Sequence, residues 1–117
     1  MKTVKIGVMP EKQFRQYMLD IATGRTTPKR GSPKIWFHSM KSLAEVLSDN
    51  NRTLLKIIAE EQPETIKELA KISGRQPSNL GRTLKTFERY GFIKLEKNAK
   101  TKKPIAKAVD FDISLSA

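Results

Sequence analysis

The spacing of apolar residues in the first third of the chain predicts a strand, a helix and a second strand. Residues 4–8 alternate between apolar and polar or glycine positions, as a short strand does, and Pro10 ends the pattern. Residues 35–37 are an apolar run that is too short for a helix but suits a brief strand. Between them, residues 11–22 carry apolar side chains at helical spacing, namely Phe14, Tyr17, Met18 and Ile21.

Two further helices are predicted before residue 65. Ser42 and Glu45 have the spacing of a capping box, which opens a short helix that the polar cluster 48–51 ends. A new helix with a wide apolar face follows from Leu54, and Pro63 prevents its continuation.

The region after residue 64 has the pattern of a helix-turn-helix. Thr65 and Glu68 form a second capping box, and Gly74 is placed to leave that helix in a left-handed turn. Pro77 suits the first turn of the next helix, 77–90, whose apolar stripe is Leu80, Leu84 and Phe87. Two helices joined by a tight turn that contains glycine make up this motif.

The face opposite the stripe of helix 77–90 is basic and polar. In a helix-turn-helix the second helix enters the major groove, where Arg pairs with guanine edges and Asn or Gln with adenine. We expect base specificity from the entering end, at Gln76, Ser78, Asn79 and Arg82. Gly81 either permits close approach of the backbone or is simply a weak helix former on an exposed face. The full predicted contact set of this motif is Arg75, Gln76, Ser78, Asn79, Arg82, Thr83, Lys85, Thr86 and Arg89.

A period of two replaces the helical period after Gly91, which predicts a hairpin. Ile93 and Leu95 begin one strand, residues 98–104 are turn-like and basic, and residues 109–115 alternate as the far strand. The predicted tip carries four lysines that can straddle the phosphate backbone or merely keep an edge hairpin soluble, namely Lys97, Lys100, Lys102 and Lys103.

Net charge favours a polyanionic partner. The 117 residues hold 23 Lys and Arg against 12 Asp and Glu, a net charge of +11, and the pI is about 10.1. The surplus is concentrated in residues 75–107, with ten basic and two acidic residues. An anionic membrane is the other possible partner, but the sequence shows no apolar span of about 20 residues, and residues 1–10 have too few apolar side chains for us to expect a secretory leader. We therefore expect nucleic acid as the partner, no membrane, and a cytoplasmic location.

The chain is poor in two residue types that enzymes often use for catalysis, cysteine and histidine. Cysteine is absent and His38 is the one histidine, which excludes thiolate metal sites and cysteine nucleophiles and removes most imidazole sites. We expect no cofactor, no metal and no enzymatic activity. Trp36 and Phe37 are expected in the core, with a dimer interface as the alternative.

The residues TIKELAKISGRQPSNLGRTLKTFERYGFIKLEK, 65–97, carry a family resemblance. They resemble the winged helix-turn-helix core of MarR-like transcriptional regulators, which implies that helix 77–90 reads DNA and that a hairpin over 92–113 is the wing. The stretches KTVKIGVMP and PKIWFHSMKSLAEVLSDNNR resemble a small group of DNA-binding proteins in that superfamily, some of them encoded beside toxin genes. This resemblance adds a toxin protein to the partners to be considered.

These observations together predict an α+β fold, a winged helix-turn-helix with an N-terminal strand-helix-strand extension. Residues 1–38 form an arm suited to dimerisation, and residues 39–117 form the DNA-binding domain. The expected function is that of a homodimeric, sequence-specific regulator that binds double-stranded DNA. The alternative is an RNA-binding or protein-interaction module, such as an antitoxin-type adaptor. The sequence disfavours a single-strand reader because Phe87, Phe92 and Phe111 occupy core positions.

Overall fold

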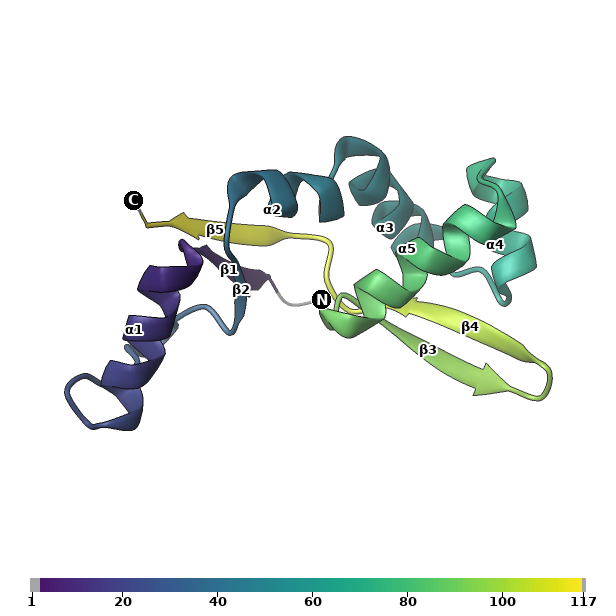
Figure 1. Cartoon of the computed structure of the whole chain (residues 1–117). Helices are drawn as coiled ribbons and strands as arrows, with labels where there is room; N and C mark the ends of the chain where they lie inside the picture. Colours follow the sequence, from purple (N-terminus) through teal and green to yellow (C-terminus); the bar gives the residue numbers. More distant parts are fainter. Residues whose placement is uncertain (1–2, 117) are drawn as a thin grey trace. The chain divides into compact units, whose positions relative to one another are not determined.

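The chain is α+β and divides into two compact units (Figure 1). The computed structural model describes residues 3–116, so Met1, Lys2 and Ala117, which belong to the predicted domains 1–38 and 39–117, lie outside the described residues. Residues 46–110 form the helix–hairpin unit, and residues 3–45 together with 111–116 form the sheet unit. The described residues contain five helices and two small sheets, which confirms the mixed fold class.

The sheet unit is built on a parallel three-stranded sheet. Strand β1 (Val4–Val8) lies in the middle, with β2 (Ile35–Phe37) on one side and β5 (Phe111–Leu115) on the other. In register, Ile6 of β1 lies beside Ile35 and Ile113. Helix α1 (Glu11–Ala22) connects β1 to β2, as a parallel pair requires. These elements confirm the strand, helix and second strand predicted for the first third of the chain.

The two faces of this sheet are packed differently. Ile6 and Val8 are buried on one face. On the other face Trp36 lies beside Gly7, and Phe14 and Tyr17 of α1 contact the Trp36 ring at centroid distances of 5.6 and 5.7 Å. A Cβ on Gly7 would lie 2.2 Å from a ring carbon of Trp36, so only glycine fits there.

Helix α2 (Met40–Val46) begins earlier than the sequence predicted. The hydroxyl of Ser39, and not that of Ser42, takes the capping position, and it accepts a hydrogen bond from the Ser42 N–H at 3.1 Å. Both serines are good caps, and the start at Ser39 follows directly after β2 and leaves Ser42 in the first turn. The predicted capping box at Ser42 and Glu45 is therefore wrong.

Three helices of the helix–hairpin unit begin and end at strong local signals. Helix α3 (Asp49–Glu61) is capped by Ser48, α4 (Ile66–Ser73) by Thr65, and α5 (Pro77–Arg89) begins with proline. The bounds of α4 and α5 agree with the predicted helix-turn-helix elements. Helix α4 packs against α3, α5 and β4, and α5 packs against β3. The buried side chains of this unit include Leu54, Leu55, Ile58, Leu69, Leu80, Leu84, Phe87, Phe92 and Ile93.

The hairpin is shorter than predicted and has a different second strand. Strand β3 (Ile93–Asn98) pairs antiparallel with β4 (Thr101–Ala106), and only residues 99 and 100 join them. The predicted far strand, 109–115, is instead β5, which pairs in parallel with β1, so the predicted hairpin over 92–113 is wrong. Alternation marks a strand but not its partner. The N–H of Lys107 donates to the carbonyl of Phe92 at 2.8 Å, so Lys107 lies at the base of the hairpin.

The boundary between the units also falls elsewhere than residue 38. The sheet unit takes in residues up to 45 and returns at residue 111, because β5 completes the sheet around β1. The helix–hairpin unit is thus a continuous insertion between two segments of the sheet unit.

Candidate nucleic-acid interface

A short, well-defined turn fixes α5 relative to α4. The Thr65 hydroxyl accepts from the Glu68 N–H at 3.0 Å, and the Glu68 carboxylate accepts from the Glu64 N–H at 3.1 Å, so the start of α4 is capped on both sides. At its end, Gly74 has a φ of 73° and its N–H donates to the Ala70 carbonyl at 2.9 Å. Only residues 74–76 separate Ser73 from Pro77, which begins α5, so the connection between the two helices is short.

Helix α5 has one face in the core and one in solvent. Leu80, Leu84 and Phe87 are at most 1% exposed, and they attach the helix to its unit. The opposite face is exposed and polar or basic, as the sequence predicted, with Ser78, Asn79, Arg82, Lys85 and Arg89. Gln76, directly before the helix, is exposed as well. This face has no role in the core and is available for a partner.

The two threonines of the predicted set differ from the rest of that face. Thr83 and Thr86 are half-buried, and their hydroxyls donate to the carbonyls of Asn79 and Arg82 at 3.2 and 3.1 Å. A hydroxyl that donates within its own helix retains only its acceptor capacity. Phosphate oxygens accept hydrogen bonds, so these two residues are weaker candidates for phosphate contacts.

Arg75, in the turn, is tied to α3. It is half-buried, and its Nη2 donates to Oδ1 of Asn51 at 3.0 Å. Asn51 is itself held, because its Nδ2 donates to the Val46 carbonyl at 3.0 Å and its N–H donates to the Ser48 hydroxyl. The sequence contains no signal for this link, since Asn51 and Arg75 are 24 positions apart. Asn51 is therefore a positioning residue that the sequence analysis missed.

Arg89 is held at the end of α5 by aromatic stacking. Its guanidinium carbon lies 5.3 Å from the centre of the Tyr90 ring, and Tyr90 stacks on Phe92 at 5.7 Å. A cation over an aromatic face is stabilised by about 0.5–1 kcal/mol at an exposed site. Its charge is still exposed, so a positive group sits at a defined place between the helix and the hairpin.

The tip of the hairpin concentrates like charges. Lys97 of β3 lies directly opposite Lys102 of β4, and Lys100 is in the turn between them. All three are exposed. Like charges directly opposite each other in an antiparallel pair destabilise it by roughly 0.2–1 kcal/mol. An anion bound at the tip would relieve this repulsion.

Lys103 does not lie with the other tip lysines. Its Nζ is 3.1 Å from Oε1 of Glu64, just before α4, and its side chain is 29% exposed. The prediction that it projects from the tip is wrong, because alternation along β4 directs it away from its neighbour Lys102. Lys103 instead ties the hairpin to the start of α4.

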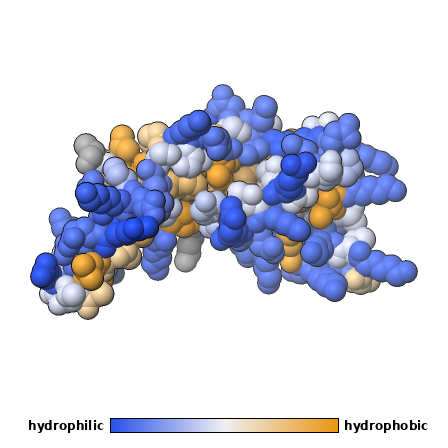
Figure 2. All heavy atoms as spheres, in the orientation of Figure 1, coloured by the Kyte–Doolittle hydropathy of each residue, from blue (hydrophilic) through white to orange (hydrophobic). Residues whose placement is uncertain are grey.

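The surface of the helix–hairpin unit is strongly hydrophilic around these elements. Figure 2 shows hydrophilic side chains projecting from the end of the unit that carries the hairpin tip and α4. Residues 75–107 hold ten basic residues and only Glu88 and Glu96 as acids, a surplus of eight charges. The field over α5 and the hairpin is therefore positive.

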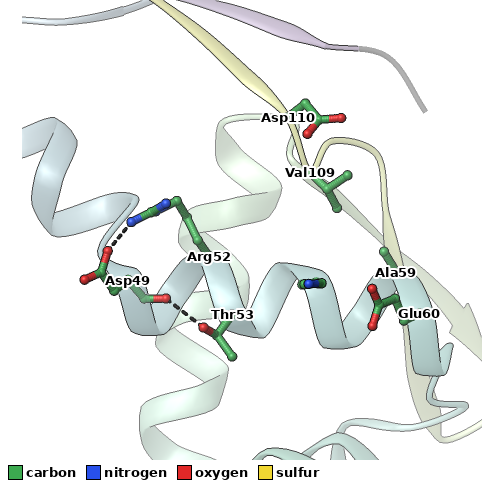
Figure 3. A pocket seen from close by; sticks show the side chains of 8 residues that line it. Asp49, Arg52, Thr53, Ala59, Glu60, Val109 and Asp110 are labelled. Atoms are coloured by element: carbon green, nitrogen blue, oxygen red, sulfur yellow. Dashed lines mark hydrogen bonds and ion pairs between the residues drawn. The ribbon is translucent and has the colours of Figure 1, made fainter.

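A separate open cavity of about 530 Å³ lies along α3 (Figure 3). Its lining combines both signs of charge: Arg52 and Lys56 line it together with Glu60 and Asp110, and Arg52 forms an ion pair with Asp49. Because the signs are mixed, this cavity does not extend the positive surface of α5 and the hairpin.

The described residues offer neither a membrane span nor a cluster of metal ligands. Within residues 3–116, no helix has the length and apolarity needed to cross a membrane. Over the same residues, His, Asp and Glu side chains do not gather in a group of three or more that could hold a metal ion.

Comparison with protein families gives a match over the helix–hairpin unit. None of the curated proteins compared with the chain matches it. A family model described as HVO_A0114 matches residues 46–113, which include the whole helix–hairpin unit and the start of β5. The match covers more than half of the 117 residues. The chain belongs to the HVO_A0114 family.

Proposed function

We propose that this protein is a sequence-specific, double-stranded DNA-binding regulator of transcription with a winged helix-turn-helix of the MarR-like type. In this proposal α5 enters the major groove, and the β3–β4 hairpin is the wing that lies along the phosphate backbone. The observation that carries the proposal is the solvent-exposed face of α5, which is basic, has no core role, and belongs to the same unit as a hairpin tip of opposed lysines.

The first half of α5 is suited to reading bases. Arg82 can donate two hydrogen bonds to a guanine edge, and Asn79 can pair with an adenine edge. Gln76 and Ser78 lie beside them at the start of the helix, where a recognition helix meets the base edges.

The second half of α5 and the hairpin tip are suited to phosphate. Lys85 and Arg89 lie farther along the exposed face of α5, and Lys97, Lys100 and Lys102 form the tip. Such contacts add affinity and orientation with little sequence information. We assign Arg75 and Lys103 to positioning, because each bonds to a residue of its own unit, and we expect any contact they make with DNA to be secondary.

The competing proposal is an RNA-binding or protein-interaction module. A single-strand reader stacks bases on exposed aromatic side chains, whereas Phe87 and Phe92 are 0% exposed and Phe111 is half-buried. The buried rings favour duplex DNA. A homodimer, a toxin partner and a cytoplasmic location remain proposals.

Selection of bound duplexes from a random pool tests this function. We expect enrichment of a defined motif, and a selected duplex should outcompete the single strands and an RNA duplex of the same sequence. A pool that yields no motif, or equal competition by single-stranded RNA, would contradict the proposal and favour the alternative module.

A further inference from the structure

Strand β5 is an uncovered edge of the parallel sheet. In the order β2-β1-β5 it has β1 on one side, and no strand among residues 3–116 pairs with its other side. Four of its five residues are exposed, including Ile113 at 45% and Leu115 at 63%. A sheet edge with unpaired N–H and C=O groups and apolar side chains is a template for another strand.

The hydrogen bonds of β5 show which backbone groups face that edge. The Ser116 N–H donates to the Val8 carbonyl of β1 at 2.9 Å. Residues two apart in a strand direct their backbone groups to the same neighbour, so Ser114 and Asp112 also face β1. Ile113 and Leu115 therefore direct their N–H and C=O groups to the open edge.

One antiparallel register suits a second copy of this strand. With Ile113 on the two-fold axis, the two Ile113 residues can exchange N–H···O=C bonds, and Leu115 lies opposite Phe111 of the second copy. Asp112 then lies opposite Ser114 of the second copy and not opposite another carboxylate. A register centred on Asp112 would instead place the two carboxylates directly opposite each other, which is unfavourable.

The positive charge of the chain opposes self-association less at this edge than elsewhere on its surface. The chain carries +11, so two copies repel each other over most of their surface. Residues 108–116 contain Asp110 and Asp112 and neither Lys nor Arg. Proteins commonly protect an exposed edge strand with lysine, and β5 lacks this protection although lysine and arginine make up 23 of the 117 residues.

We propose that two copies of this protein pair through the open edges of β5, antiparallel about Ile113, and form one continuous six-stranded sheet. The pairing brings Phe111, Ile113 and Leu115 of both copies together on one sheet face, and so reduces the exposed apolar surface of Ile113 and Leu115. The interface lies wholly in the sheet unit, and the proposal does not depend on nucleic-acid binding.

Sedimentation of the full chain over a range of micromolar concentrations tests the pairing. We expect a dimer, and Ile113→Lys should weaken dimerisation by about tenfold or more, because it places two like charges opposite each other on the axis. The matched control is Leu19→Lys, which adds the same charge to α1 of the same unit at a side chain that is 54% exposed. Circular dichroism verifies that both variants are folded.

Crosslinking tests the register. The chain has no cysteine, so Ile113→Cys introduces a single thiol. Opposed residues of a hydrogen-bonded antiparallel pair have Cα atoms about 5.5 Å apart, within disulfide range, so mild oxidation should link the two copies. Ser114→Cys alone should not crosslink, because the two Ser114 positions are diagonal, roughly 7–8 Å apart.

Three results would overturn the proposal: a monomeric wild type, a dimer that Ile113→Lys leaves intact, or crosslinking through Ser114→Cys in place of Ile113→Cys. Failure here is separable from failure of the proposed function. A monomer that still selects a DNA motif would refute the pairing alone, and a dimer that binds no duplex would refute the DNA proposal alone.

Discussion

The basic residues of the candidate interface differ in how much freedom their side chains retain. Arg75 donates to Asn51, Lys103 pairs with Glu64, and Arg89 lies over Tyr90. Arg82 is exposed in the middle of α5, and within residues 3–116 its guanidinium forms no ion pair. A planar guanidinium in this position can form the bidentate contact that distinguishes guanine.

Replacement of Arg82 tests this role. Arg82→Ala should cost about 1–3 kcal/mol for the preferred duplex and should relax preference at one base pair, because phosphate contacts remain. Binding to single-base variants of the selected motif measures the change. Arg15→Ala is the matched control, since it removes the same charge from an exposed α1 side chain and should leave base preference unchanged. An unchanged base preference in Arg82→Ala would show that Arg82 does not contact a base.

Two glycines should respond oppositely to alanine. Gly7→Ala forces a methyl group against the Trp36 ring and should destabilise the protein by about 1–3 kcal/mol, as overpacking does. Gly81→Ala meets no atom within 4 Å, and it should stabilise α5 by about 0.5–1 kcal/mol. Denaturant unfolding measures both free energies. If Gly81→Ala is more stable yet binds DNA less well, close approach of the backbone at Gly81 is the reason.

At the scale of elements, local signals predicted most helices and missed the strand partners. Thr65, Gly74 and Pro77 mark the ends of α4 and α5 through backbone chemistry that acts within a few residues. The sequence did not predict strand β4. Its first three residues, Thr101 and the two lysines after it, lie outside the core, so they do not alternate between apolar and polar side chains. The exposed face of α5 followed from helical spacing, whereas the contacts of Arg75 and Lys103 depend on residues distant in sequence.

The lysines of the hairpin tip should lower the stability of the fold but increase the affinity for DNA. Lys102→Ala removes one of two opposed charges, so it should leave the free energy of unfolding unchanged or raise it by up to about 1 kcal/mol. The same variant should weaken binding to all duplexes alike and reduce the salt slope by about one.

Lys103→Ala is the control for this prediction, because it removes the same charge together with the ion pair to Glu64. It should not stabilise the protein, and it should reduce the salt slope less than Lys102→Ala does. Equal slopes for wild type and Lys102→Ala would exclude the tip from the interface.

At the scale of the whole molecule, net charge governs both proposed associations. A chain of +11 gains affinity for DNA through release of counterions, and the same charge opposes self-association. Added salt should therefore weaken DNA binding and strengthen dimerisation, because screening reduces the attraction between protein and DNA and the repulsion between two copies of the protein.

Titration with salt tests this opposition. If six to ten phosphates are neutralised, DNA affinity should fall by about three to five orders of magnitude between about 50 and 200 mM salt. Dimerisation measured by sedimentation over the same range should tighten or stay constant. A DNA affinity that hardly changes with salt would contradict an interface built on phosphate contacts.

The position of β5 in the sheet also affects how the protein is synthesised. The ribosome completes β1 and β2 early, and then makes all of residues 46–110 before β5 appears. At about 5–20 residues per second, β1 lacks its second neighbour for the several seconds in which the helix–hairpin unit is made. A ribosome that stalls after residue 110 would hold a nascent chain in which α5 has been made but β1 still lacks β5 as a neighbour.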